Sequence, residues 1–504
     1  MHIEERFAQY ALVHLPIDLR PLTDRERAIL PLLIEAAHAM DDAFWIQIYG
    51  DPTPLLRSTT DPDIQEYIRL NYGPWDAVRD NEPFVAGVSA KPPGANFYPL
   101  DVTKQELEAR AAINPELTSR YTMVRRDTHG ALIAIPYHTF FQTQVQRAAV
   151  KLRQAAELID QADLQTFLTV RADALLTDEY RASEYAWMAL KDNLVDILIG
   201  PMETSADQLC GQKAAYAATI LIKDVLWSKR LSHYTHFLPH LQEGLPVSPA
   251  YKREQPGLET DLYVYDILYC AGYDNAGLPI GVSWPDDDEV RLRAGTRTLL
   301  LKNAMQAKFE QLVLPIADLL IANDQRHYVS FDAYFTFVMF HEIAHGLGLR
   351  RTITDNALVK ESLKDLDHVI EESKANLLSL VVVAYLNQIG ELRDVDLGAV
   401  YVSGLAHLLR LWDTRQAVIQ LNFFKEMGAY TRDAVTKTYR VHMNRMQVSI
   451  AVLTERLLRL QGDGDYAGAK ALVERYNTPD DSIAADMQRF HSAGHPIEVR
   501  LVQT

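Results

Sequence analysis

A short motif inside an apolar stretch constrains this chain more than any other feature. Residues 341–345 read His-Glu-Ile-Ala-His, and the surrounding residues 335–349 are almost wholly apolar. Such a run, with glycines after it, predicts a buried helix. Residues four apart on a helix share a face, so His341 and His345 should lie side by side. Polar groups buried in a core need partners, and a metal ion supplies one.

The motif has the form H-E-x-x-H, in which two histidines bind zinc and Glu342 takes a proton from a water that zinc activates. A third ligand is expected on a second helix, where Glu372 follows Glu371. Three protein ligands leave a fourth position open, as a catalytic zinc site requires. In the alternative reading, the two glutamates form a solvated helix face. His368 is a further candidate that fits a structural role better.

Composition narrows the class of protein. The chain has 504 residues, a formal net charge of −17 and two cysteines, Cys210 and Cys270, so a disulfide scaffold and a four-cysteine zinc site are excluded. It has no conspicuous basic cluster, so we expect no nucleic-acid partner. The N-terminus does not resemble a signal peptide, and the apolar run 377–386 is too short to cross a membrane. We therefore expect a cytoplasmic protein without a membrane partner.

Periodicity and turn residues predict mixed structure in the first half and helices in the second. Thr23 and Glu26 form a capping box that opens a helix to about Met40. Strands are expected at 194–202, 262–272 and 279–284, and helices at 104–111, 142–160, 205–243, 290–322, 330–347, 357–388, 396–410, 416–428, 440–461 and 465–476. This pattern indicates an α+β fold that is mostly helical.

Several segments together resemble the dipeptidyl peptidase III family of zinc metallopeptidases, in its short H-E-x-x-H form. Residues 371–376, EESKAN, fit the family's second motif E-E-x-[RK]-A-[ED] in all but the last place. Residues 200–215 resemble its G-P-x-E-T-x-x-D-x-L-x-G-x-K-A-A segment, and residues 266–291 resemble the strands that line its substrate cleft. The resemblance covers most of residues 190–480.

The resemblance implies a two-lobed zincin fold. One lobe is helical and carries zinc, the other contains a small β-barrel, and substrate lies between them. We expect residues 1–205 and 256–300 to form the mixed lobe, residues 206–255 and 301–480 the zinc lobe, and residues 481–504 a C-terminal segment.

The resemblance also assigns roles by position. His341, His345 and Glu372 would bind one Zn²⁺ per chain, and Glu342 would be the general base. Glu371 would accept a hydrogen bond from a zinc histidine and orient it.

The chain departs from the family pattern in four respects, at five positions. Ser205 stands where the family has a tyrosine whose hydroxyl stabilises the oxyanion, and Ser283 and Asp286 replace two asparagines that grip the peptide backbone. Asn376 replaces the acidic end of the second motif, although it can still accept a hydrogen bond from a zinc histidine. The departures put peptide binding in doubt more than metal binding.

The fourth departure concerns a catalytic histidine. An ungapped alignment places Asp413 at its position, with His407 and His442 nearby as alternatives. Glu203 matches a family carboxylate that binds the N-terminal ammonium of a peptide. An equally weighted alternative is that Glu203 is a structural contact that persists with the fold.

Three functions are compatible with these residues. The first is a zinc-dependent hydrolase that cleaves small peptides, as a dipeptidyl peptidase does. The alternative is a zinc enzyme of the same scaffold redirected to a small non-peptide molecule, by hydrolase, lyase or isomerase chemistry. The third is a binding module with structural zinc, which an intact Glu342 disfavours because a structural site does not need it.

Overall fold

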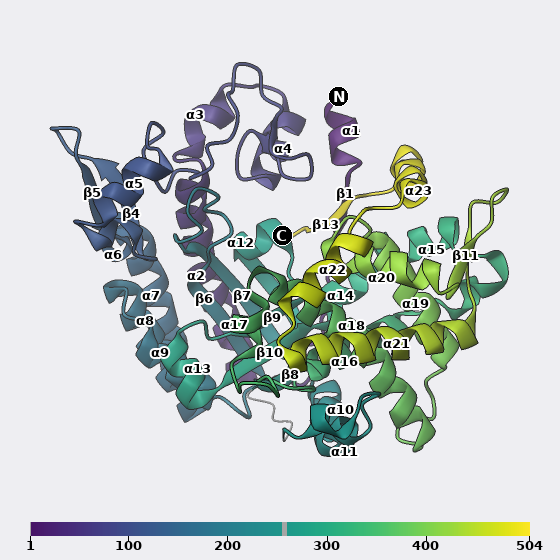
Figure 1. The fold of residues 1–504 in the computed structure, drawn as a ribbon. Helices are drawn as coiled ribbons and strands as arrows, with labels where there is room; N and C mark the ends of the chain where they lie inside the picture. Colours follow the sequence, from purple (N-terminus) through teal and green to yellow (C-terminus); the bar gives the residue numbers. More distant parts are fainter. Residues whose placement is uncertain (1, 255–259, 504) are drawn as a thin grey trace. The chain divides into compact units, whose positions relative to one another are not determined.

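The computed structural model describes residues 2–254 and 260–503 (Figure 1). The chain divides into two compact units. Unit 1 comprises Met1–Val225, Val264–Ala304 and Glu498–Thr504, and unit 2 comprises Leu226–Tyr263 and Met305–Ile497. The lobe boundary expected at residue 256 lies outside the described residues.

A five-stranded sheet with the order β6-β7-β8-β10-β9 forms the centre of unit 1. Its strands are β6 (Val195–Glu203), β7 (Ala215–Lys223), β8 (Thr260–Gly272), β9 (Gly281–Trp284) and β10 (Thr296–Leu301). The β6–β7, β7–β8 and β9–β10 pairs are antiparallel. The small barrel that the resemblance implies corresponds to this sheet, whose described strands run in a linear order.

Helices cover the sheet of unit 1, and three further strand pairs complete the unit. The helices are α1 (Ile3–Phe7), α2 (Asp24–Ile48), α3 (Pro52–Arg57), α4 (Pro62–Leu70), α5 (Lys104–Ala111), α6 (Tyr137–Phe140), α7 (Gln142–Leu158), α8 (Ala162–Thr177), α9 (Arg181–Ala189), α12 (Tyr273–Gly277) and α13 (Asp288–Ala294). The pairs are β1 (Tyr10–Val13) with β13 (Glu498–Leu501), β2 (Trp75–Asp76) with β3 (Glu82–Pro83), and β4 (Thr122–Arg126) with β5 (Leu132–Pro136).

Helix α2 joins the sheet to the helical layer. The predicted capping box is present, because the Glu26 amide donates to Thr23 Oγ1 and the Thr23 amide donates to the Glu26 carboxylate. The helix packs on α7 and on β7, and Figure 1 shows α2 and α7 side by side. Gln47 near its end bonds the edge of β7, donating to the Ala214 carbonyl and accepting from the Tyr216 amide.

The predicted helix at 205–243 is wrong in its first half. Residues 215–223 read AYAATILIK and form β7, which is buried on both faces between β6 and β8. A short apolar run without alternation fits a buried strand as well as a helix, and pairing decides between them. Residues 206–225 therefore pack in unit 1, whereas the sequence placed residues 206–255 with the zinc lobe.

The predicted helix at 290–322 is also interrupted. Residues 296–301 read TRTLLL and form β10, which pairs with β9. Gly295, at φ 77°, ends the preceding short helix and turns the chain into the strand. The segment forms a strand because it pairs with β9, which lies earlier in the chain.

Unit 2 is a helical assembly with one short hairpin. Its helices are α10 (Val225–Thr235), α11 (Leu238–Glu243), α14 (Lys302–Lys308), α15 (Leu314–Leu320), α16 (Phe331–Ala344), α17 (Val359–Leu363), α18 (Asp367–Gln388), α19 (Leu397–Arg410), α20 (Arg415–Glu426), α21 (Met443–Asp463), α22 (Tyr466–Tyr476) and α23 (Asp481–Ser492), and its hairpin joins β11 (Tyr430–Arg432) to β12 (Tyr439–Val441). Helices α10 and α14 begin in the last residues of unit 1 segments.

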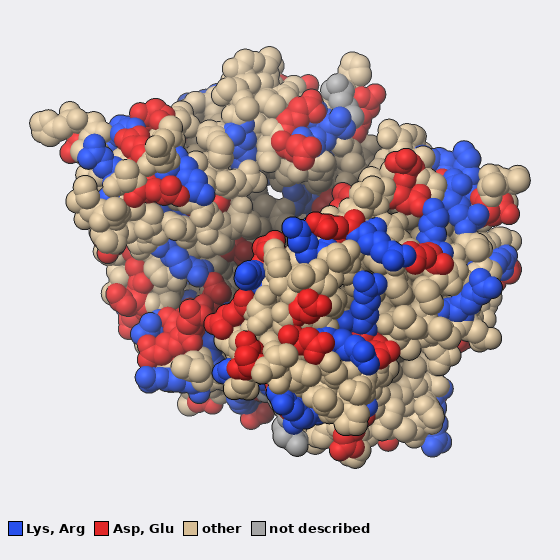
Figure 2. Space-filling view, viewed as in Figure 1, with Lys and Arg blue, Asp and Glu red and all other residues tan. Residues whose placement is uncertain are grey.

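Helix α18 is central to unit 2, because α16, α20 and α21 all pack against it. The expected C-terminal segment 481–504 is divided between the units, with α23 in unit 2 and β13 in unit 1. Across the described residues, no helix combines the length and the apolar character that crossing a membrane requires. On the face shown in Figure 2, acidic and basic side chains are interspersed despite the net charge of −17.

Candidate metal centre and substrate cavity

Helix α16 carries both histidines of the H-E-x-x-H motif. Ser330 caps it, with its Oγ accepting from the Ala333 amide at 3.3 Å, and its middle is buried on nearly every face. His345 stands directly after the last helical residue and keeps helical backbone angles, φ −59° and ψ −28°. The two imidazoles therefore lie on consecutive turns of one face, as the sequence predicts.

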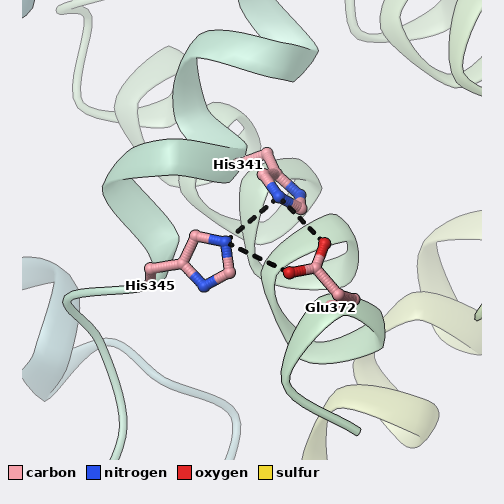
Figure 3. A group of neighbouring side chains, drawn as sticks. All are labelled: His341, His345 and Glu372. Carbon is pink, nitrogen blue, oxygen red and sulfur yellow. Dashed lines mark hydrogen bonds and ion pairs between the residues drawn. The ribbon is translucent and has the colours of Figure 1, made fainter. Parts of the chain in front are cut away.

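Helix α18 brings Glu372 to the same point. The Nε2 atoms of His341 and His345 are 3.2 Å apart, and the Glu372 carboxylate oxygens lie 3.6 Å from His341 Nε2 and 3.9 Å from His345 Nε2. Figure 3 shows the three side chains converging from the two neighbouring helices. Within the described part of the chain, no other group of three His, Cys, Asp or Glu side chains has its ligand atoms within 4.8 Å of one another.

The far nitrogen of each imidazole is held by an acceptor. His341 Nδ1 lies 2.9 Å from Asn376 Oδ1, and His345 Nδ1 lies 2.8 Å from Glu371 Oε1. When each Nδ1 donates its proton to that oxygen, each Nε2 presents a lone pair to the other. Two lone pairs at this separation require a cation between them, either a proton or a metal ion.

The donor set fits zinc. Tetrahedral Zn²⁺ with bonds of about 2.0–2.1 Å places its ligand atoms about 3.3 Å apart. The separations among His341, His345 and Glu372 are 3.2, 3.6 and 3.9 Å, so small side-chain movements complete such a site. Two neutral imidazoles and one carboxylate, with acceptors behind the imidazoles, form a common catalytic zinc site.

Glu371, which is partly exposed, is bonded to two buried side chains besides His345. Besides His345, its carboxylate accepts from Lys374 Nζ at 2.8 Å and from Gln461 Nε2 at 2.7 Å. Burial opposes the ionised form, but the charge of Lys374 and the His345 hydrogen bond prevail and hold the pKa of Glu371 well below its usual range. Lys374 is 3% exposed and also donates to the Leu347 carbonyl. No role for Lys374 or Gln461 was predicted from the sequence. Gln461 lies on α21, and no motif around it in the sequence points to the metal centre.

Glu342 follows His341 on the same helix. Burial raises the pKa of its carboxyl, His345 opposes this when it is protonated, and the negative charge of Glu372 adds to the rise. Burial and the charge of His345 lower the pKa of His341 to about 3, so this imidazole stays neutral and able to bind a metal.

The three candidates for the family's catalytic histidine lie in different surroundings. Asp413 is exposed in the turn between α19 and α20. His442 directly precedes α21, and its side chain bonds away from the helix, with Nε2 3.0 Å from Thr431 Oγ1. His407 is buried on α19 against the ring of Tyr334 at 5.3 Å, and burial, Arg410 and His341 lower its pKa to about 3.

Three of the four predicted substrate-binding residues line one cavity of unit 1, and the fourth, Ser205, contacts a lining residue, Tyr273. A cavity of about 490 Å³ lies among the end of β6, α12, β9 and the adjoining loops, and its lining includes Glu203, Ser283 and Asp286. It also includes Tyr273 and Asp274, which sequence reasoning did not single out. Burial raises the pKa of Glu203, as does the charge of Asp286, while Arg120 opposes them.

Each residue that departs from the family pattern here has a partner within the protein. Ser205 Oγ lies 2.6 Å from the Tyr273 hydroxyl, and Ser283 Oγ lies 2.6 Å from Thr298 Oγ1. Asp286 accepts from Arg120 at 2.6 Å. These side chains therefore already have bonding partners within unit 1.

Comparison with known proteins places this geometry in context. Residues 104–374 match the sequence model of peptidase family M49. The structure of DPP III from Caldithrix abyssi is 31% identical, with 99% of this chain and 98% of that chain covered and a TM-score of 0.94. Dipeptidyl-peptidase III from Corallococcus sp. strain EGB is 32% identical over 99% of this chain and 96% of its own, with a TM-score of 0.82. Nudix hydrolase 3 of Arabidopsis thaliana is 26% identical, over 99% of this chain and 73% of that protein.

Proposed function

Because the chain belongs to peptidase family M49, we propose that it is a zinc-dependent hydrolase that releases dipeptides from small peptides. Both structural relatives are named as dipeptidyl peptidases III, and each match spans nearly the whole chain. The observation that carries the proposal is the convergence of His341, His345 and Glu372, with an acceptor held behind each imidazole.

Zinc held by these three side chains would supply a Lewis acid that polarises the scissile carbonyl and lowers the pKa of a water. Glu342 would take the proton of the attacking water and deliver it to the leaving nitrogen. Asn376 and Glu371 would keep the Nδ1 protons in place, so that both Nε2 atoms stay available. In this proposal the alignment gives Asp413 the place of the family's catalytic histidine.

The cavity of unit 1 supports an ammonium-binding role for Glu203. Glu203, Asp274 and Asp286 line it together, which favours a cationic group such as the N-terminus of a peptide. Ser283 and Asp286 would then border the bound peptide backbone. One zinc ion per chain and a small peptide are the cofactor and partner of this proposal.

The residues that depart from the family pattern favour a second candidate function. Ser205, Ser283 and Asp286 are bonded to protein partners. They are therefore less suited to bind a peptide backbone than the residues that the family has at these positions. In this second function, the protein would be a zinc enzyme that acts on a small non-peptide molecule, and Glu342 would again move the proton.

The test measures zinc content and dipeptide release from a dipeptidyl-arylamide with the purified protein. Glu342→Gln should keep zinc and lose activity by about a hundredfold or more. Glu361→Gln makes the same change at an exposed position on α17 and should alter neither. Zinc without dipeptide release would reject the peptidase and leave the second candidate, whereas absence of zinc from the zinc-supplemented protein would reject both.

Two more substitutions complete the experiment. Glu372→Ala should abolish stoichiometric zinc, and retained zinc would remove it from the ligand set. Asp413→Asn and His407→Phe, compared in the same assay, would show which of the two takes part in turnover.

A further inference from the structure

Tyr273 brings a phenol into the unit 1 cavity beside Ser205. The Tyr273 hydroxyl lies 2.6 Å from Ser205 Oγ, and both Tyr273 and Glu203 line the cavity. We propose that Tyr273 donates a hydrogen bond to the carbonyl oxygen of a bound α-aminoacyl group, and that Ser205 orients the phenol. This rests on the proposed function, in which Glu203 binds the ammonium of the same group.

The phenol is held on a rigid element. Strand β8 ends at Gly272, which has φ 63° and sits where a Cβ atom would come 2.3 Å from the Tyr216 carbonyl oxygen. The chain then turns into α12, and residues 272–275 at this junction are bonded to three other parts of unit 1. These bonds run from the Gly272 amide to Asp41 Oδ1 at 2.9 Å, from Thr219 Oγ1 to Asp274 Oδ2 at 2.5 Å, and from Asn275 Nδ2 to the Tyr72 hydroxyl at 2.9 Å.

The Tyr273 ring also packs edge-on against Phe44, with centroids 6.1 Å apart. The position of the ring is therefore set by packing and by the bonds on either side of it, and does not depend on the hydroxyl. Because the ring is already fixed, it loses little conformational entropy when a ligand binds.

The Ser205–Tyr273 pair gives the cavity a donor beside Glu203. Each hydroxyl has one proton and can accept two hydrogen bonds. A ligand carbonyl only accepts, so it selects the arrangement in which Ser205 donates to Tyr273 and Tyr273 donates to the carbonyl. Such a chain strengthens both bonds. Burial raises the pKa of Tyr273 and the charge of Glu203 adds to this, while the Ser205 bond opposes it, so the phenol keeps its proton.

The carboxyl groups of the cavity suit a different part of the ligand. Glu203, Asp274 and Asp286 are carboxyl groups, which as carboxylates only accept, and the Ser283 hydroxyl is engaged with Thr298. A peptide N-terminus presents an ammonium, which donates, one carbon away from a carbonyl, which accepts. In this inference, the hydroxyl pair distinguishes an aminoacyl group, which has a carbonyl, from a simple amine, which has none.

The experiment measures binding of two probes to the zinc-loaded protein by calorimetry. The dipeptide alanyl-alanine carries both groups, and butylamine carries the cation alone. Tyr273→Phe keeps the ring and should weaken dipeptide binding by about threefold to tenfold, the usual worth of one hydrogen bond, with butylamine unchanged. Tyr269→Phe on β8 is the matched control and should change neither, because Tyr269 packs on His38 and is not among the described residues that line the cavity.

Ser205 is tested through a double-variant comparison. If it acts through the phenol, Ser205→Ala should weaken dipeptide binding less than Tyr273→Phe, and the double variant should match Tyr273→Phe alone. Additive effects, equal loss of both probes, or wild-type dipeptide binding by Tyr273→Phe would each overturn the inference. If wild-type protein binds the dipeptide and Glu203→Gln abolishes this, the proposed function stands whatever Tyr273 does. If wild-type protein binds no dipeptide, the proposed role of the cavity fails first.

Discussion

Replacing Asp274 by asparagine should stabilise unit 1 at neutral pH. Asp274 is 7% exposed, and its carboxyl accepts a hydrogen bond from Thr219 Oγ1. Burial raises its pKa from 3.8 to about 6, the Thr219 bond opposes the rise, and the charge of Glu203 adds to it. Asparagine has nearly the same shape, can accept the same bond, and carries no charge to be buried.

The sign and size follow from proton binding. Between its unfolded pKa of 3.8 and its folded pKa of about 6, Asp274 is protonated in the folded state and ionised in the unfolded state. The folded state thus binds more protons, and stability falls as pH rises through this window. Above the window the folded protein carries a penalty of about 3 kcal/mol, which the substitution removes, and at about pH 5 the gain is about half as large.

Hydrogen exchange is the suitable measurement, since a chain with two units need not unfold in one step. Peptides from β7 and β8 should exchange more slowly in Asp274→Asn, with a larger gain at about pH 8 than at about pH 5. Asp192→Asn, at an exposed position before β6, is the control and should show no gain. A loss of protection at both pH values would refute the reasoning, because it would mean that the charged form of Asp274 is the one that the fold stabilises.

Three other substitutions test separate features. Glu371→Gln should lower zinc affinity by about tenfold to a hundredfold in chelator competition, and an unchanged affinity would show that this carboxylate does not orient a ligand. Asp196→Ala removes the carboxylate 3.7 Å from Arg297, where both side chains are fully buried, and should cost unit 1 about 3–5 kcal/mol in urea unfolding; a cost below about 1 kcal/mol would contradict this. Gly272→Ala should destabilise unit 1 by more than about 2 kcal/mol, and a wild-type melting temperature would rule out the close approach at this position.

Helix starts could be predicted from the sequence, because capping depends on residues that are close together in the chain. The Thr23–Glu26 box marks the start of α2, and Ser330 caps α16 as expected. The same holds for the convergence of His341, His345 and Glu372, since the fixed spacing within each motif places the side chains on one side of α16 and α18. The family assignment, made from several such segments, is confirmed by the comparisons.

Elements defined by distant partners could not be predicted in this way. Strand β7 was predicted as a helix because its apolar run fits both structures, and its neighbours β6 and β8 are what make it a strand. Gln461 reaches Glu371 from far along the chain, and Tyr273 reaches Ser205 across the sheet. Such contacts depend on topology, which no local pattern records.

The pairing of β1 with β13 has a consequence for how the protein is made. Residues 10–13 lie beside residues 498–501 in parallel, so the first strand of unit 1 acquires its neighbour after all of unit 2 has been synthesised. At about 5–20 residues per second, a ribosome takes roughly half a minute or more to reach that point. During this time β1 has an open edge, which makes the nascent chain a natural client for chaperones. Fusing residues 498–503 ahead of β1 by circular permutation should shorten that exposure.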